Sequence, residues 1–277
     1  DDGAEPADVR KQKAAEYARQ VMRSAYRAAI GGIMPMDDVS FTHRPYPIAE
    51  IRNVFRDRSF EAMRRDWPDM TEAREFKNGA YKRSISMRTN AAQFQRVTNN
   101  VPVWRELSRH IETPEFIRSI MDILEENEVD IGVSDVRPIK YRSPLNRLRR
   151  PLARLLKRNY LAARMEFSAM PSDGGHITPH TDMPSKIMTI VVNIDGQEDG
   201  FIGGTSIVEP KDEKRIHNPS NEYLGFDDVT ELRRVDFQRN CGLLFIRTDN
   251  SWHCVFPISG PAGGFRRSIN INIEMIR

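Results

Sequence analysis

Apolar and polar residues alternate along the C-terminal part of the chain, which is the pattern of strands that bury one face. Clusters of Gly, Pro, Asn and Asp separate the alternating stretches, as turns would. This spacing is typical of an all-β barrel or jelly roll. Residues 211–235 have no clear pattern and are expected to form an excursion between strands. The predicted strands cover residues 163–170, 186–194, 205–210, 241–247, 254–258 and 266–276.

The N-terminal part of the chain has a different pattern. Apolar residues recur at steps of three and four over 8–30, which predicts a helix ended by a glycine pair. A second helix is predicted over 59–67, and a third from the cap Thr113 to about Leu124. Residues 49–55 have the composition of a short strand.

Together these patterns predict an α+β fold in a single domain, 1–277. Residues 160–277 are expected to form a jelly-roll or cupin-like barrel, which holds the functional site. Residues 1–159 are expected to form a mainly helical support packed on that barrel.

Composition excludes several classes of protein. The chain has 277 residues with a net charge of +3, which is too small to indicate a nucleic-acid binder. It has no apolar run near the ~20 residues of a membrane-spanning helix, and its start lacks the apolar core of a signal peptide. Two cysteines do not make a disulfide framework. These features predict a cytoplasmic protein.

The charges are unevenly distributed. Residues 137–158 contain nine Lys or Arg and no Asp or Glu. The simplest interpretation is a solvated basic face. The alternative is an anionic partner: a phosphorylated saccharide, a lipid headgroup, or the inner face of a membrane, which the protein would contact peripherally.

The stretch GGHITPHTDMPSK (174–186) contains a His-x-Asp triplet, His180 and Asp182. At the edge of a strand, residues i and i+2 project to one face, so both side chains can point into a barrel and hold a metal. His253, 71 residues after Asp182, is the best candidate for the third ligand of a two-His-one-carboxylate site. The intervening length leaves room for about four strands, as a jelly roll requires. The alternatives are an exposed turn at the triplet and a core histidine at 253.

With Arg266-Arg267-Ser268, which begins 13 residues after His253, this ordered set resembles the Fe(II)- and 2-oxoglutarate-dependent oxygenases. Their pattern is His-x-Asp/Glu, a distal His, and Arg-x-Ser on a late strand of a double-stranded β-helix. The resemblance covers roughly residues 160–277. Residues 46–70 also resemble a segment of bacterial members found among sugar and cell-surface biosynthesis enzymes.

The resemblance implies that His180, Asp182 and His253 bind Fe(II), and that Arg266 with Ser268 binds the distal carboxylate of 2-oxoglutarate. Oxygen is then consumed, succinate is released and the substrate is hydroxylated.

Other residues have less specific predicted roles. Strand alternation places Arg266 on the face of Ser268, so Arg266 is preferred to Arg267 as the partner of the cosubstrate. Lys186 and Thr189 are further candidates for cosubstrate binding, with core filling or hydrogen bonding as the alternative. The candidates for substrate contact are Arg164, Glu166, His176, Asn193 and Trp252.

Three functions remain open at this stage. The first is a dioxygenase that hydroxylates an unactivated C–H bond of a small or saccharide-linked substrate, with an anionic saccharide or glycolipid preferred because of the basic segment. The second is a prolyl-type hydroxylase of a peptide or protein. The third is a cupin-like metal- or sugar-binding module without oxygenase activity, which would need no carboxylate-binding arginine.

Overall fold

The structure is a computed structural model that describes residues 9, 13, 32–77, 79–143 and 158–276. The predicted helix over 8–30 and residues 144–157 of the basic segment therefore lie outside the described residues. The helices are α2 (Asp57–Arg65), α3 (Ala91–Asn100), α4 (Pro102–Ile111) and α5 (Pro114–Glu126), with 3-10 turns at Gln197–Asp199, Glu213–Arg215 and Phe226–Asp228. The strands are β1 (Asp38–Thr42), β2 (Ile48–Arg52), β3 (Arg74–Phe76), β4 (Ala80–Ser86), β5 (Val136–Pro138), β6 (Asn159–Pro171), β7 (His176–His180), β8 (Lys186–Asn193), β9 (Gly204–Pro210), β10 (Val229–Asp236), β11 (Gly242–Ile246), β12 (His253–Val255) and β13 (Phe265–Met275).

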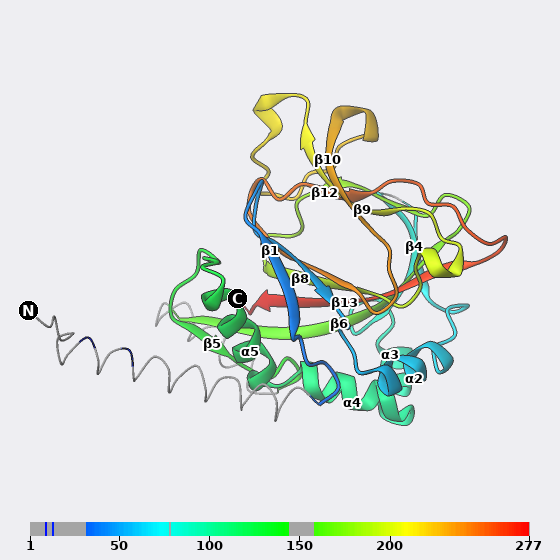
Figure 1. Cartoon of the computed structure of the whole chain (residues 1–277). Coiled ribbons are helices and arrows are strands. Elements are labelled where there is room, and N and C mark those ends of the chain that lie inside the picture. The colour runs from blue at the N-terminus through cyan, green and yellow to red at the C-terminus, as the bar shows by residue number, and fades with distance from the viewer. Residues whose placement is uncertain (1–8, 10–12, 14–31, 78, 144–157, 277) are drawn as a thin grey trace, which may run out of the picture.

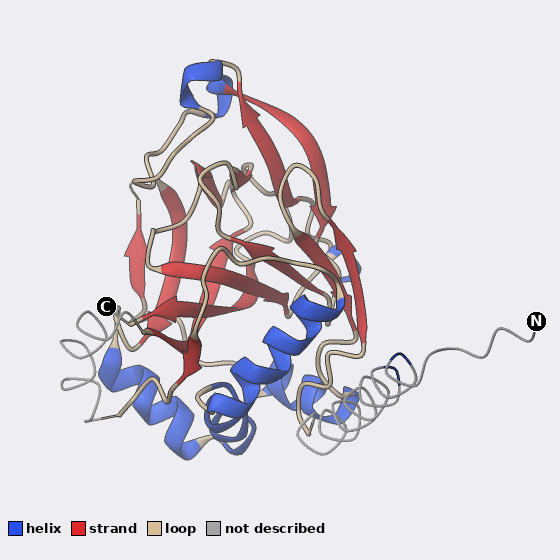
Figure 2. Ribbon diagram, turned by 90° about the vertical axis from the view of Figure 1, so that its left-hand side faces the viewer, coloured by secondary structure: helices blue, strands red, loops and turns tan. Residues whose placement is uncertain are grey.

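Eight of these strands form the barrel, and their order identifies it. Strands β6, β13, β8 and β11 are neighbours in one sheet, and β7, β12, β9 and β10 are neighbours in the facing sheet. Successive strands pass between the two sheets, apart from β9 and β10, which form a hairpin-like antiparallel pair. This is the strand order of a double-stranded β-helix, so the predicted fold class is confirmed. Figure 2 shows the two layers of strands around the interior.

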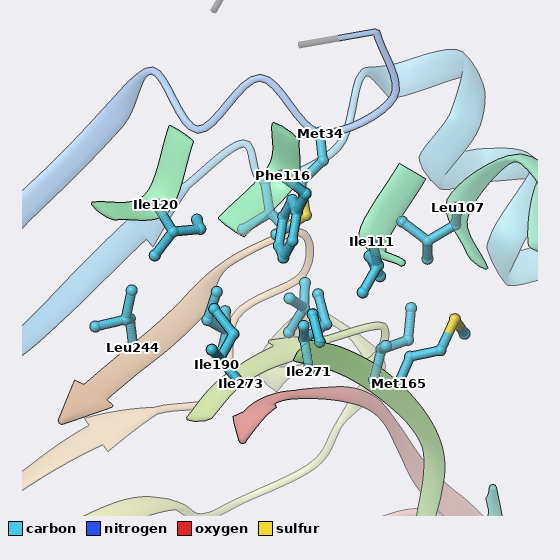
Figure 3. Packing of buried hydrophobic residues seen from close by; sticks show 14 of the residues in the cluster. Met34, Leu107, Ile111, Phe116, Ile120, Met165, Ile190, Leu244, Ile271 and Ile273 are labelled. Atoms are coloured by element: carbon cyan, nitrogen blue, oxygen red, sulfur yellow. The ribbon is translucent and has the colours of Figure 1, made fainter. Parts of the chain in front are cut away.

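The helices pack on the outer face of the sheet that contains β6, β13 and β8. Figure 1 shows α2 to α5 gathered beside the long strands β6 and β13, while β9, β10 and β12 lie on the far side. In Figure 3, helix side chains such as Phe116 and Ile120 lie over sheet side chains such as Ile190 and Ile271. Each of these four side chains is at most 1% exposed. The described helices and the sheet thus share one apolar core.

The described residues before the barrel contain strands that the sequence analysis did not indicate. Besides the predicted strand β2, they form β1, β3, β4 and β5. Strand β4 pairs with β6 through Arg83 to Ser86 and with β7 through Ala80 and Tyr81, so it belongs to both sheets. The unpatterned stretch 211–235 was also misjudged, because its last seven residues, 229–235, belong to strand β10. No helix within the described residues is long and apolar enough to cross a bilayer.

The N-terminus of α5 is fixed as the sequence predicted. The hydroxyl of Thr113 accepts a hydrogen bond from the backbone N–H of Phe116 at 3.1 Å, and Pro114 occupies the first turn. The buried face of this helix includes Phe116 and Ile120, which form part of the shared core. The cap therefore stabilises a helix that the barrel needs.

We expect Thr113→Ala to lower the free energy of unfolding by about 1 kcal/mol, because the Phe116 N–H loses its acceptor. Thr113→Ser keeps the hydroxyl and should cost much less. Urea unfolding of both variants beside the parent protein measures the difference. An alanine variant as stable as the parent would show that the cap contributes nothing.

Candidate metal centre and its pocket

Two histidines face each other across neighbouring strands. His180 ends β7, His253 begins β12, and the two are direct partners in the antiparallel register. Their ring centroids are 4.4 Å apart. In each ring Nδ1 lies within hydrogen-bond distance of a backbone carbonyl: Thr178 O at 2.9 Å for His180 and Ser251 O at 2.8 Å for His253. Each Nδ1–H therefore donates to a carbonyl, and each Nε2 keeps its lone pair for another partner.

A turn after β7 brings the carboxylate of Asp182 close to the two histidines. The sequence argument did not include this turn. Strand β7 ends at His180, and Asp182 lies beyond it with a left-handed φ of 63°. The expected continuation of a strand through both residues was therefore wrong, although the side chains still converge. One ligand atom from each of His180, Asp182 and His253 can be chosen so that all three lie within 4.8 Å of one another.

Asp182 is held on both of its oxygens. Lys186 Nζ lies 2.6 Å from Oδ1, and the Thr189 hydroxyl donates to Oδ2 at 2.9 Å. Burial opposes the carboxylate charge, but Lys186 and the two histidines more than offset it, so the pKa of Asp182 is held below its usual value. The carboxylate is thus ionised and fixed in direction. Since each carboxylate oxygen has two lone pairs, these bonds leave room for a metal.

Burial also sets the charge of the histidines. It lowers the pKa of His180 to about 3, with a contribution from neighbouring His253, and it lowers the pKa of His253 as well. Both imidazoles are therefore neutral at physiological pH, as metal ligands must be. Two neutral imidazoles and one carboxylate, all buried, fit a divalent first-row metal such as Fe(II).

The three side chains line a cavity of about 270 Å³ that also contains Arg266. The Arg266 side chain is 1% exposed, and its guanidinium carbon lies 3.8 Å above the centre of the Phe237 ring. Its Nε and Nη1 have no hydrogen-bond partner among the described residues. Burial lowers the pKa of Arg266 to about 10, so the group is still charged at neutral pH. A buried and unpaired guanidinium is costly, and a carboxylate would satisfy it.

Arg267 lies on the opposite face of β13. Its guanidinium makes two bonds of 2.7 Å to Asp195 and one of 3.0 Å to the carbonyl of Arg64. Arg267 therefore stabilises the fold, and it does not line the cavity. The alternation argument that preferred Arg266 agrees with this arrangement, and Ser268 and Asn270 line the cavity beside Arg266.

The remaining predicted residues divide into two groups. Lys186, Thr189, Arg164 and Glu166 line the cavity, and Lys186 and Thr189 form hydrogen bonds with Asp182. Three other candidates lie outside the lining. His176 bonds the carbonyl of Gly174, Asn193 lines a separate hollow, and Trp252 packs in a cluster with Val208 and Cys254.

The sequence analysis did not identify many residues of the cavity wall, and four of them are examples. Lys82 and Phe76 come from the part expected to be mainly helical, and Tyr223 comes from the unpatterned stretch. Met183 follows Asp182 directly and is 49% exposed at the cavity. Their neighbours in sequence give no signal, because tertiary pairing of β4 and the path of the loop before β10 bring them to the site.

No family model and no curated protein sequence matches this chain. Among solved structures, it is similar to a Pseudomonas putida prolyl-4-hydroxylase (11% identity, 91% of this chain and 98% of that chain covered, TM-score 0.45). It is also similar to a 2OG-Fe(II) oxygenase family protein from Burkholderia pseudomallei (11%, 91% and 90%, TM-score 0.43). A third is the α-ketoglutarate-dependent epimerase SnoN from nogalamycin biosynthesis (10%, 92% and 81%, TM-score 0.43). At this distance we base the function on the strand order and the cavity alone.

We expect one divalent-metal site that His180→Ala abolishes, because the variant loses one of three ligands. Titration of the protein with Mn(II), or with Fe(II) without oxygen, measures this by calorimetry. Because the pKa of His180 is about 3, no proton competes with the metal near neutrality. Affinity at about pH 6 should therefore equal that at about pH 8, whereas histidines of ordinary pKa would lose affinity on acidification.

His176→Ala serves as the control, since this residue lies on the same strand but outside the cavity lining. Unchanged metal affinity in His180→Ala would refute the assignment.

Proposed function

We propose that this protein is an Fe(II)- and 2-oxoglutarate-dependent oxygenase that hydroxylates an unactivated C–H bond of an anionic substrate. The observation that carries the proposal is a single cavity with two features. A buried His-Asp-His cluster lines it, and so does a buried guanidinium that lacks a partner within the described residues. The first feature suits Fe(II), and the second suits the distal carboxylate of the cosubstrate.

His180, Asp182 and His253 would hold the metal, and Arg266 with Ser268 would hold 2-oxoglutarate. When bound, iron together with 2-oxoglutarate and O2 supplies the oxidising power: one oxygen atom enters the substrate as a hydroxyl group and the other enters succinate, with loss of CO2. The protein orients these components. Its backbone carbonyls fix the tautomer of both imidazoles, and Lys186 and Thr189 fix the carboxylate.

The charge of the cavity wall supports an anionic substrate. Four cationic side chains line it (Lys82, Arg164, Lys186 and Arg266) against two anionic ones (Glu166 and Asp182), a formal excess of two positive charges. A divalent metal and a 2-oxoglutarate dianion cancel each other, so the excess remains for the substrate. Glu274 behind Arg164 does not change this balance, because it is also paired with Arg88.

The same wall ranks the alternative functions. A prolyl side chain is neutral and would leave the net positive charge of the cavity wall unmatched, so a prolyl-type hydroxylase is less favoured than an enzyme of an acidic substrate. A cupin-like binding module would not need Arg266, and burying its guanidinium without a partner costs free energy. Peripheral contact with an anionic membrane through 137–158 stays a prediction, since residues 144–157 lie outside the described residues.

We expect the protein, loaded with Fe(II) and 2-oxoglutarate in air, to release succinate, and an accepted substrate to increase that release. Asp182→Ala should release none, because it lacks the carboxylate ligand. Succinate is measured by chromatography against a panel of acceptors. The Zn(II)-loaded protein is the control for contaminating activity. Protein that binds metal and 2-oxoglutarate yet releases no succinate with any acceptor would be a binding module, and the proposal would fail.

We expect Arg266→Ala to raise the apparent requirement for 2-oxoglutarate at least roughly 30-fold, because losing a buried charge-assisted pair costs about 2–5 kcal/mol. Arg267→Ala is the matched control on the neighbouring residue. It should lower thermal stability through its lost bonds to Asp195 and leave the 2-oxoglutarate requirement nearly unchanged. The reverse result would assign the cosubstrate to Arg267.

A further inference from the structure

Two cations of the cavity wall have hydrogen-bond donors to spare. Lys82 Nζ donates to Glu166 Oε1 at 3.1 Å, which uses one of its three N–H groups. Arg164 directs Nε and Nη2 at one oxygen of Glu274, at 3.0 and 2.8 Å. Its Nη1 is buried, lies 3.8 Å from Glu166 Oε2, and has no hydrogen-bond partner in the described part of the chain. Because Arg164 is only 7% exposed, its Nη1 needs a hydrogen-bond acceptor, and a molecule bound in the cavity would provide one.

The sheet register places Arg164 near the candidate metal ligands and away from Arg266. Arg164 is opposite Asn272 of β13, and Asn272 is opposite Thr189 of β8, whose hydroxyl bonds Asp182. Two strand spacings, about 10 Å, therefore separate the backbones of Arg164 and Thr189. Arg266 lies six residues before Asn272 on the same strand. The anion that meets Arg164 is thus a different group from the distal carboxylate of the cosubstrate.

An aromatic ring stands at the same cavity with an open face. The ring of Tyr223 stacks on His180, with centroids 5.4 Å apart and planes at 17°, and the residue is 52% exposed. It also packs against Gly79, where an added Cβ would lie 3.2 Å from Cε1 of Tyr223. The loop is fastened near the metal ligands, because Leu224 N donates to Pro179 O and Thr181 Oγ1 donates to Asn218 O. These contacts hold the ring of Tyr223 in place beside the cavity.

The polar groups between these elements indicate what a ring at Tyr223 carries. Glu166 and Asn270 line the cavity and are partners across β6 and β13, and the hydroxyl of Ser168 is buried without a partner among the described residues. Acceptors and donors at this density match the hydroxyl groups of a saccharide better than a plain aromatic acid. The cations beside them match a carboxylate.

We propose that Lys82, Arg164 and Tyr223 form the substrate subsite, and that the substrate is a sugar acid whose ring lies on Tyr223 and whose carboxylate meets Arg164 Nη1 and Lys82 Nζ. This inference rests on the proposed function, which leaves the class of anion and its contacts open. It assigns specificity to two strands, β4 and β6, and a loop that lie outside the His-x-Asp, His and Arg-x-Ser pattern.

The test is binding of glucuronate, glucuronamide and glucose to the full chain loaded with Mn(II) and 2-oxoglutarate, measured by calorimetry. Glucuronate should bind about tenfold more tightly than glucuronamide, because only the acid forms charged hydrogen bonds. Lys82→Met and Arg164→Met should remove that preference. Arg83→Met is the matched control, since the neighbouring Arg83 lies over the Phe265 ring, 5.0 Å away, and does not line the cavity.

Tyr223→Ala should weaken all three probes about equally, whereas Tyr223→Phe should bind them as the parent does. Thermal unfolding of each variant checks that it is folded. Equal affinity for glucuronate and glucuronamide, or no binding of glucuronate, overturns the subsite. If Mn(II) and 2-oxoglutarate still bind and Fe(II)-loaded protein still releases succinate, only this inference falls. If they do not, the proposed function falls with it.

Discussion

The site depends on the separation of apolar from polar side chains across the three long strands β6, β13 and β8. These strands pair over most of their length, with Ser268 of β13 opposite both Ser168 and Asn193. Because successive residues of a strand point to opposite faces, one set of side chains packs under the helices and the other enters the barrel. The outward set includes Phe167 and Ile271, which are fully buried in the shared core. The same pairing that builds this core therefore fixes the spacing of the polar groups inside.

This constraint explains why much of the fold and site could be predicted from the sequence. Alternation is a local signal, so it indicated six of the eight barrel strands and placed Arg266 and Arg267 on opposite faces. The convergence of His180 and His253 needed only strand order. Strand β10 gave no such signal, because it lies at the sheet edge and most of its residues are exposed on both faces. The direction of Asp182 depends on a single left-handed residue, which a strand pattern does not encode.

The residues that remained hidden come from tertiary pairing. Lys82 reaches the cavity because β4 bridges the two sheets, and Tyr223 because its loop is tied to the backbone before Asp182. Trp252 is adjacent to His253 in sequence, but its indole N–H donates to the carbonyl of Ile216 and its side chain does not line the cavity. Proximity in sequence to a ligand is thus a poor guide, because neighbouring residues of a strand face opposite ways.

Strand β4 also determines how the chain can be divided. It covers the free edges of β6 and β7, and β2 covers the edge of β11 in the same way. A fragment beginning at residue 160 would contain all eight barrel strands and both histidines, yet it would expose three rows of unpaired backbone N–H and C=O groups. Such edges pair readily with other chains, so the isolated barrel would aggregate by strand addition. The strands before the barrel therefore protect its edges from pairing with other chains. A chimera that joins this barrel to another N-terminal segment must supply a strand for each of these edges.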